Sequence, residues 1–500
     1  MNVIRDEQTG HPYSTWMVLA TVMVGTLLIG LGRTVANLGL PEMINDFGIS
    51  VSSAGWIATA YIISNAVFVP VFGKLGDKVG NRRIYFWSFI AFVVVSIGAS
   101  VAWNLSSMIF FRALQGLVGA AIYPTAMALI VRNFTDPDER TQALGMWSAS
   151  FAISAVLGPL IGGPLIDNFS WRWLFYINIP FGILGILMTM RYLPDDAPVD
   201  KEPGFDYKGA VTLGVALTAL VLVLEQGMDW GWLSFESIVA YAIIGVFSYI
   251  FIRTEMKEHD PIVDLKLFKN PVFTNVLIIS FISFGGMMGA MFLLPVFAQT
   301  YLGFNATQTG FLFIPMSLAM FVAAPLGGRL SKRVPLRYLM AVGMTIASCG
   351  IYLLTDLDVK STALELSLPL AVFAVGLGLS MSPMTAAVAN SAPPSEVGVS
   401  SAVLNLVRNI AGAVGIAFFG TLLTKSIESQ VMRIGYDTVI QTTNVSTLQL
   451  AQTLIILKAQ ISAYSEVFFV ASGIMFFAAL VALFLKTPTR TQDNINQATS

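Results

Sequence analysis

Long apolar runs separated by short polar segments organise the whole chain. A helix that crosses a bilayer needs about 20 apolar residues, and on that rule the sequence predicts about fourteen membrane spans. We place these spans near residues 14–38, 54–73, 83–102, 106–131, 141–166, 173–191, 207–227, 236–253, 273–301, 308–330, 337–355, 364–390, 400–424 and 462–485. Three longer polar segments, 192–206, 254–272 and 425–461, are predicted to be loops. The pattern therefore predicts an all-α integral membrane protein.

The placement of lysine and arginine predicts which side of the membrane each loop faces. The short loops on one face hold most of these residues, among them Lys74, Arg132 and Lys332, and the loops on the other face hold almost none. Positively charged loops stay on the cytoplasmic side. We therefore expect both termini in the cytoplasm, in agreement with an even number of spans.

Composition excludes most classes of soluble protein. The chain has 500 residues, of which 55% are hydrophobic and 11% are charged, whereas soluble domains carry about 25% charged residues. A net charge of −1 gives no attraction to nucleic acid. With one cysteine and only two histidines, both in polar segments, we expect no catalytic residue, no metal ion and no cofactor. The expected partners are membrane lipids and a small-molecule substrate.

The spans divide into two halves with an insertion between them. We predict a six-helix bundle over 1–191, a linker with two extra spans over 192–272, a second six-helix bundle over 273–486 and a cytoplasmic tail over 487–500. The sequence after span ten, Gly327–Arg333, weakly repeats Gly73–Arg83 after span two but lacks its acid. Related halves that enclose a site at the middle of the membrane are typical of secondary transporters.

Three motifs in the first half resemble one family. Gly-Lys-Leu-Gly-Asp-Lys-Val-Gly-Asn-Arg-Arg at 73–83 is similar to the loop signature of the major facilitator superfamily. Phe-Arg-Ala-Leu-Gln-Gly at 111–116 is similar to the arginine motif of its fourth span. Gly-Pro-Leu-Ile-Gly-Gly-Pro at 158–164 resembles its antiporter motif. Any one of these motifs is moderately specific, and their occurrence in order is a strong indication.

Further segments narrow the resemblance to one branch. Residues 171–180 and 261–268 look like the fourteen-span drug:proton antiporters of the EmrB/QacA type, and the resemblance continues through 405–409. It implies a major facilitator fold, with two six-helix bundles plus two extra helices, that exports amphipathic compounds by alternating access. It also implies the proton gradient as energy source and the inner (plasma) membrane as location. In a Gram-negative host it implies a periplasmic adaptor protein as partner.

The resemblance assigns a cytoplasmic gate to Gly73, Asp77, Gly80, Arg82 and Arg83. In the family, the acid at the position of Asp77 docks on the start of a helix in the other half, here span thirteen. A carboxylate is favoured at a helix N-terminus by about 0.3–2 kcal/mol. The alternative is an ordinary charged turn that only fixes topology.

The antiporter motif supplies Gly158, Pro159, Gly162 and Gly163 in span five. Proline removes a backbone hydrogen bond and kinks a helix, and small residues let a neighbouring helix approach closely. Together they predict a bendable seam in the outer half of the span. Close packing without movement is the alternative.

Arg112, Gln115 and Glu225 are candidates for proton coupling. An arginine inside a span costs at least about 2.5 kcal/mol on insertion scales, so Arg112 should face the interior and contact Gln115 one turn away. The alternative is a buried hydrogen-bonding strut. Glu225 is an acid well inside span seven, and intramembrane acids are functional candidates by default. It could instead reach the outer interface.

The first span departs from the family pattern. Relatives commonly read Leu-Asp-x-Thr where this chain reads Leu-Gly-Arg-Thr, so the expected acid is Gly32 and a cation follows it at Arg33. Arg33 and Asn37 share a helix face, and an arginine in the cavity would favour a carboxylate or a phosphate. The alternative is that Arg33 extends toward the outer lipid headgroups.

The other cavity candidates lie in spans nine and thirteen: Phe284, Met288, Gln299, Asn405 and Arg408. For the residues of span nine, the alternative is ordinary packing. For Asn405 and Arg408 in span thirteen, the alternative is a set of polar contacts between helices. A second function keeps the same fold and carries an anionic metabolite or lipid, with arginines of the cavity as counter-charges. A membrane enzyme lacks support, because the chain offers almost no acid/base groups inside the membrane.

Overall fold

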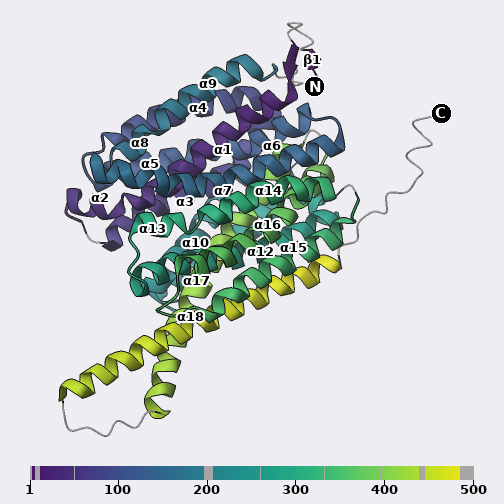
Figure 1. Ribbon diagram of the computed structural model, residues 1–500. Helices are drawn as coiled ribbons and strands as arrows, with labels where there is room; N and C mark the ends of the chain where they lie inside the picture. The colour runs from purple at the N-terminus through teal and green to yellow at the C-terminus, as the bar shows by residue number, and fades with distance from the viewer. Residues whose placement is uncertain are drawn as a thin grey trace.

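The structure is a computed structural model that describes residues 3–5, 12–49, 51–195, 206–258, 261–331, 333–393, 396–437 and 445–484. It is almost wholly helical (Figure 1). A short antiparallel pair, β1 (Val3–Arg5) and β2 (Pro12–Ser14), precedes the first helix.

The helices fall into three groups along the chain. The first comprises α1 (Thr15–Leu38), α2 (Leu40–Phe47), α3 (Val51–Val79), α4 (Asn81–Ser100), α5 (Leu105–Gly119), α6 (Ile122–Asn133), α7 (Pro137–Asn168), α8 (Trp173–Tyr176) and α9 (Asn178–Tyr192). The second comprises α10 (Tyr207–Trp230), α11 (Phe235–Glu255) and the 3-10 turn η1 (Leu265–Lys269). The third comprises α12 (Pro271–Tyr301), α13 (Ala306–Phe311), α14 (Ile314–Leu330), α15 (Leu336–Tyr352), η2 (Leu353–Asp356), α16 (Ala363–Ser391), α17 (Val397–Asp437) and α18 (Val445–Leu483).

Thirteen helical segments in the described ranges are long and apolar enough to cross a membrane. The remaining predicted span, 141–166, lies on the long helix α7. Helices suit this environment because every backbone polar group inside a bilayer must be satisfied within the protein. The number fourteen and the cytoplasmic termini stay predictions. The strand β1 and the last turn of α18 lie at the same end of the bundle, which we call the terminal end (Figure 1).

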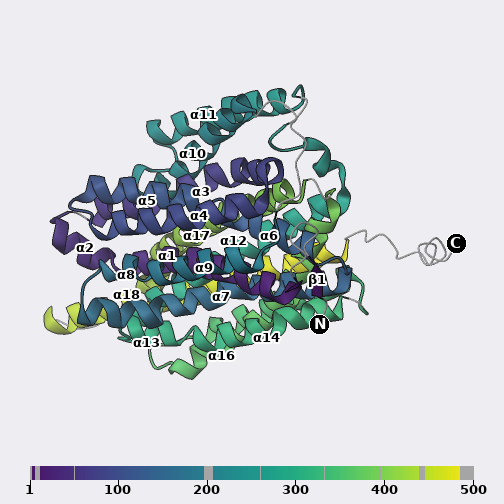
Figure 2. The ribbon, with the colours of Figure 1, turned by 90° about the horizontal axis from the view of Figure 1, so that it is seen from above.

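Each half is held by its own helix pairs. In the first half α1 packs against α7 and α9, and α3 packs against α5. In the second half α14 and α15 pack against α16, and α12 packs against α17. The halves meet where α7 contacts α14 and α16, and where α17 contacts α3 and α6. The hairpin of α10 and α11 lies outside α3, and α10 also contacts α17 (Figure 2).

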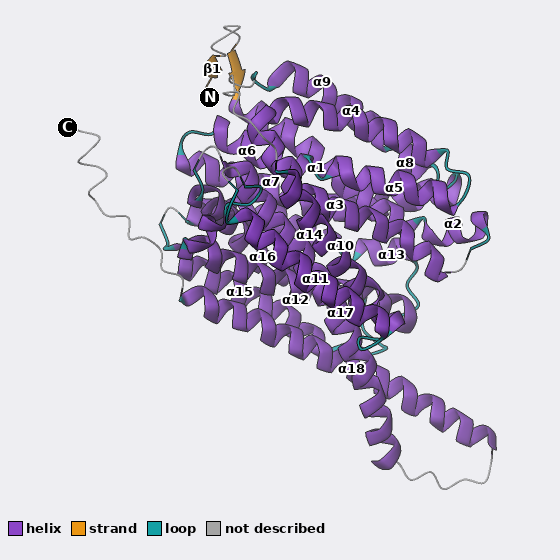
Figure 3. Ribbon diagram, turned by 180° about the vertical axis from the view of Figure 1, so that it is seen from behind, coloured by secondary structure: helices purple, strands orange, loops and turns teal. Residues whose placement is uncertain are grey.

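One predicted loop is wrong. We expected residues 425–461 to form a polar loop, but α17 continues to Asp437 and α18 already begins at Val445 (Figures 1 and 3). The two helices extend beyond the bundle as a hairpin, and Ser426 donates a hydrogen bond to Glu466 at its base. The length rule detects only apolar helices, so a polar helical extension was assigned to a loop.

Candidate functional site

At the terminal end, α3 of the first half packs closely against α17 of the second half. A Cβ atom placed on Gly73 would lie 2.8 Å from both Ala402 Cβ and the carbonyl oxygen of Gly398. Real Cβ atoms essentially never come that close to other heavy atoms. Glycine at this position therefore allows two helix backbones from different halves to touch.

Asp77 lies one turn further along α3, against the first turn of α17. Its Oδ2 accepts a hydrogen bond from the backbone N–H of Val399 at 3.2 Å, and the N–H of Gly398 also donates to this carboxylate. Asn81 donates to Oδ1 at 3.5 Å. The first N–H groups of a helix have no partner inside it and carry the positive end of the helix dipole. The Asp77 carboxylate supplies acceptors to these groups from the other half of the protein.

Beside the Asp77 contact, the remaining residues of the 73–83 motif form the tight turn between α3 and α4. The predicted loop is shorter than expected, because α3 runs to Val79 and α4 starts at Asn81. Only Gly80 separates them, with φ of 111°, a conformation that favours glycine. Arg82 forms an ion pair with Asp195, and Arg83 is exposed.

A second cross-half contact joins α7 to α14 and α16 at the same end. Arg140 donates to the side-chain oxygen of Asn390 at 3.0 Å, and Ser382 donates to the carbonyl of Thr141 at 2.9 Å. A Cβ on Gly145 would lie 2.9 Å from the carbonyl of Ala324. The terminal end is therefore closed by two close-packed seams, one at α3–α17 and one at α7–α14/α16.

The antiporter motif lies at the opposite end of α7. Gly158 and Gly162 are buried, and a Cβ on Gly163 would be 3.3 Å from Thr307 Oγ1 of α13, across the halves. The helix continues through Pro159 without interruption; the side chain of Pro159 lies outside the described residues. The glycines are thus in the part of α7 that approaches the second half.

Arg112 is 1% exposed and crosses the interior of the first half. It donates to the carbonyl oxygens of Ile57 and Gly32, at 3.3 and 3.1 Å, and to Gln115 at 3.0 Å. Its guanidinium lies 4.4 Å from the centre of the Tyr61 ring. The predicted contact with Gln115 is present. Gly32, where the family resemblance led us to expect an acid, contributes a backbone carbonyl.

Arg408 links the two halves about three turns after the start of α17. It is 6% exposed and donates to the hydroxyls of Tyr123 on α6, at 3.1 Å, and Thr385 on α16, at 3.2 Å. Its guanidinium lies 4.9 Å from the centre of the Phe284 ring. Its Nε has no hydrogen-bond partner among the described residues. A buried cation thus rests on neutral groups, with one N–H left to donate.

The other candidates are more scattered. Asn409 donates to Asn405 at 2.7 Å, so these two amides satisfy each other. Met288 lies against Gly412, and Gln299 is exposed near the end of α12. Glu225 is half-buried on α10. Two further candidates, Arg33 and Asn37, belong to α1, but their side chains lie outside the described residues.

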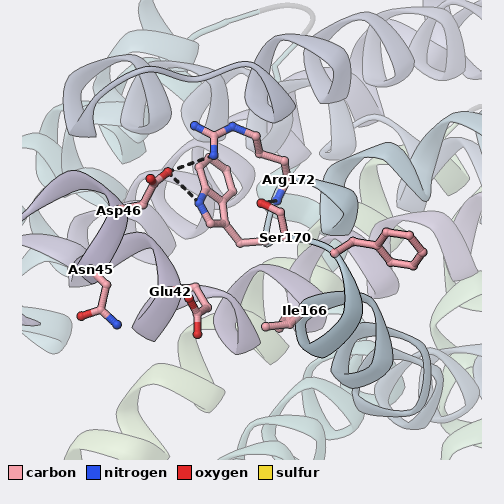
Figure 4. A pocket seen from close by; sticks show the side chains of 8 residues that line it. Glu42, Asn45, Asp46, Ile166, Ser170 and Arg172 are labelled. Carbon is pink, nitrogen blue, oxygen red and sulfur yellow. Dashed lines mark hydrogen bonds and ion pairs between the residues drawn. The ribbon is translucent and has the colours of Figure 1, made fainter.

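A pocket of about 620 Å³ lies at the end away from the termini, between α2 and the chain after α7 (Figure 4). Asp46 accepts hydrogen bonds there from Trp171 Nε1 at 3.0 Å and Arg172 at 2.9 Å. These two hydrogen bonds lower the pKa of Asp46 below its ordinary value, and the bond from Trp171 has the larger effect. Trp171 is 3% exposed, which places it in the packed interior. The hydrogen bond from Arg172 is also an ion pair with Asp46, and it ties the chain after α7 to α2.

Several residues of these contacts were not found from the sequence. Tyr123 and Thr385, which hold Arg408, look like ordinary polar residues of apolar helices. Asp46 lies in a segment between predicted spans, where nothing indicates a helix that caps the bundle. The acidic side chain of Asp46 was the one sequence signal that could have indicated this contact.

Comparison with known proteins agrees with this architecture. The family model of the Major Facilitator Superfamily matches residues 22–416. MdtP of Bacillus subtilis, a multidrug transporter protein, is 32% identical over 81% of this chain and 75% of its own length. EmrB of Escherichia coli K12, a multidrug export protein, is 28% identical over 82% and 80%. The crystal structure of the human organic anion transporter MFSD10 superposes with a TM-score of 0.63 at 15% identity, covering 94% of this chain and 99% of that chain.

The fold is that of a transporter with two packed helical halves. The chain belongs to the major facilitator superfamily, and within it to the multidrug branch of the EmrB type.

The seam at Gly73 can be tested by adding a single methyl group. Gly73→Ala should disfavour closure of the terminal end by about 1–3 kcal/mol, the usual cost of overpacking. In a Cys349→Ser background, a cysteine introduced for buried Ser401 on α17 should then react roughly 5- to 150-fold faster with a thiol reagent.

The matched control is Gly55→Ala on the same helix, where no atom of the described residues lies within 4 Å of the added methyl group. It shares the change in helix propensity but should leave the labelling rate unchanged. Equal labelling rates for both variants would contradict a seam that depends on Gly73.

The ties of Asp46 predict a small dependence of stability on pH. Because its folded pKa is lowered, its stabilisation is present above the unfolded value and is lost as pH falls through the folded value. Asp46→Asn should lower thermal stability at neutral pH by no more than about 1 kcal/mol, since the ion pair is exposed. Melting curves should show a smaller loss on acidification below about pH 4 in this variant than in wild type. Glu42→Gln, an exposed acid of the same helix, serves as the control.

Proposed function

We propose that the protein exports hydrophobic or amphipathic small molecules by alternating access, driven by the proton gradient. The observation that carries this proposal is the contact of Asp77 with the first turn of α17. The contact joins the halves through one carboxylate and two backbone N–H donors. These groups are polar, so water can hydrogen-bond to them when the halves separate. Such a contact suits a gate that opens in every cycle.

The packing around the gate supports the same mechanism. Backbones touch at Gly73 and Gly145, so the closed end excludes water with few side chains. When the halves rock apart there, substrate would enter from the cytoplasm. The glycines of the antiporter motif, at the other end of α7, would then form the opposing seam. The names of the relatives MdtP and EmrB support a multidrug substrate range.

Location and partners follow from the same proposal. A proton-driven exporter of this kind works in the inner (plasma) membrane, surrounded by lipid. In a Gram-negative host, the helical hairpin that α17 and α18 form beyond the bundle would be the surface for a periplasmic adaptor protein. Arg112, Gln115 and Glu225 stay the candidates for proton coupling.

An anionic cargo is the second candidate, and Arg408 favours it. Its described partners are the neutral groups of Tyr123, Thr385 and Phe284, and its Nε still has a proton to donate. A buried guanidinium in this state is costly, and a carboxylate or phosphate would satisfy it with a charge-assisted hydrogen bond. The substrate would then be an acidic amphiphile or an anionic lipid.

Transport in proteoliposomes tests the proposed function. Wild-type protein should move cationic amphipathic dyes against their gradient only when a pH gradient is imposed, because the proton supplies the energy. Glu225→Gln should abolish the stimulation by the pH gradient if Glu225 is the coupling acid, and exposed Glu236→Gln on the same hairpin is the control. Uphill transport without any ion gradient would contradict the proposal. If the pH gradient still stimulates transport by Glu225→Gln, Glu225 is not the coupling acid.

Substitution of Arg408 separates the two classes of cargo. Arg408→Gln should raise the KM for acidic amphiphiles roughly 10- to 100-fold if the guanidinium binds their anionic group, which corresponds to the loss of about 1.5–3 kcal/mol. Cationic dyes should be unaffected. Tyr123→Phe removes one neutral partner and keeps the charge, so it should preserve the acidic substrates. Equal transport of all substrates by Arg408→Gln would eliminate the anionic alternative.

A further inference from the structure

Two buried carboxylates face each other at the terminal end of the hairpin formed by α10 and α11. Asp206 precedes the first turn of α10, and Glu255 is the last residue of α11. They are 7% and 4% exposed. In the sequence both belonged to polar segments between spans, and the transport mechanism uses neither of them.

The two side chains converge on one point next to Gly209. A Cβ atom on Gly209 would collide with Asp206 Oδ2 and would lie 2.6 Å from Glu255 Oε1. These same two oxygens are the ones that have no hydrogen-bond partner among the described residues. The missing side chain of Gly209 thus leaves room for both acceptor atoms beside one point, and the N–H of Ile262 adds a second backbone donor to the Glu255 carboxylate.

The other oxygen of each carboxylate is already satisfied. Asp206 Oδ1 accepts from the N–H of Gly209 at 2.8 Å, and Glu255 Oε2 accepts from the N–H of Val263 at 3.2 Å. The segment that carries Val263 folds over the pair, and Ile262 and Val263 are themselves buried. Water is therefore kept away from the facing oxygens, and burial of an unpaired acceptor is costly.

Two ionised carboxylates cannot share such a site without a cation between them, because like charges in a low-dielectric environment repel strongly. Ca²⁺ or Mg²⁺ would need six or more oxygen ligands, whereas the backbone groups of Gly209 and Val263 that contact the pair are N–H donors. A single proton needs only two acceptor oxygens near one point, and Asp206 Oδ2 and Glu255 Oε1 both lie next to the Cβ position of Gly209. This is the chemistry of carboxyl pairs that hold one proton in common.

The charged groups around the pair fit the binding of one proton. Asp206 acts on Glu255 from α10, and Lys74 of α3 acts on it from the neighbouring helix. With one proton between the carboxyl groups, the pair carries a single negative charge, and the charge of Lys74 balances it. Lys74 also acts on Asp77, so the pair and the Asp77 contact lie within the field of the same cation.

We propose that Asp206 and Glu255 form a proton-binding site in which one proton is shared between Asp206 Oδ2 and Glu255 Oε1. The site belongs to the hairpin of α10 and α11, which is inserted between the halves in the sequence. It is separate from the candidate substrate-binding residues. Loss of the proton leaves two negative charges beside Lys74 and draws this cation away from Asp77. The hairpin thereby acts on the seam between α3 and α17.

Infrared difference spectroscopy of the protein in lipid nanodiscs tests the site without any transport. In the difference between spectra taken at acidic and at alkaline pH, wild type should show the C=O band of a protonated carboxyl group. Asp206→Asn and Glu255→Gln should each abolish this band, because neither remaining carboxylate then has an anionic partner. Glu236→Gln on α11 should leave the band unchanged. Asp77→Asn should keep the band but move its loss to lower pH, because Lys74 then acts on the pair alone.

Two further arms fix the interpretation. In wild type, ¹³C labelling of aspartate carboxyl groups and of glutamate carboxyl groups should each shift the band, since one residue of each type shares the proton; this result does not depend on how a variant folds. Replacement of choline chloride by NaCl at constant pH should leave the band unchanged. Absence of the band in wild type or in Asp77→Asn, a shift with only one label, or its displacement by Na⁺ would overturn the proposal.

Discussion

The structure depends on a seam that must be tight and yet separable. Lipid chains are as apolar as the helices, so no hydrophobic force drives helices together inside a bilayer. Close contact at the terminal end comes instead from glycines at which backbones touch, as at Gly73 and Gly145. Few side chains interlock there, and the polar contacts that add direction, at Asp77 and Ser382, end on backbone groups. A seam of this kind can exclude water when closed and can open without extracting large side chains.

The buried charges follow the same division of labour. Arg112 is held inside the first half by carbonyl oxygens and Gln115, so it moves with that half as a unit. Arg408 instead joins α6 of the first half to α16 and α17 of the second. Any rocking of the halves must break or lengthen its bond to Tyr123. Arg112 therefore makes the first half more rigid, whereas the hydrogen bond between Arg408 and Tyr123 depends on the distance between the halves.

The apolar pattern was sufficient for the all-helical membrane fold, because span length is a local property of the sequence, and the motifs at 73–83, 111–116 and 158–164 were sufficient for the family. It was not sufficient for the partners of the polar residues. Tyr123 is 285 residues from Arg408, and no spacing rule connects two such distant positions. The extension after Lys425 was missed for another reason, since a polar helix has no apolar run to mark it. Asp206 and Glu255 were visible only as acids in loops, and their convergence depends on how α10 and α11 pair.

The hairpin of α10 and α11 gains a physical role from its position. It packs on α3 and α17, the two helices that carry the Asp77 contact, and Lys74 lies in the electrostatic range of both Asp77 and Glu255. A single cation between two acidic sites cannot fully neutralise both, so a change of charge at one alters the field at the other. Because linkage is reciprocal, opening of the seam must in turn change how tightly the hairpin holds its proton. Two helices that could be taken as a spacer between the halves are thus placed to sense the state of the gate.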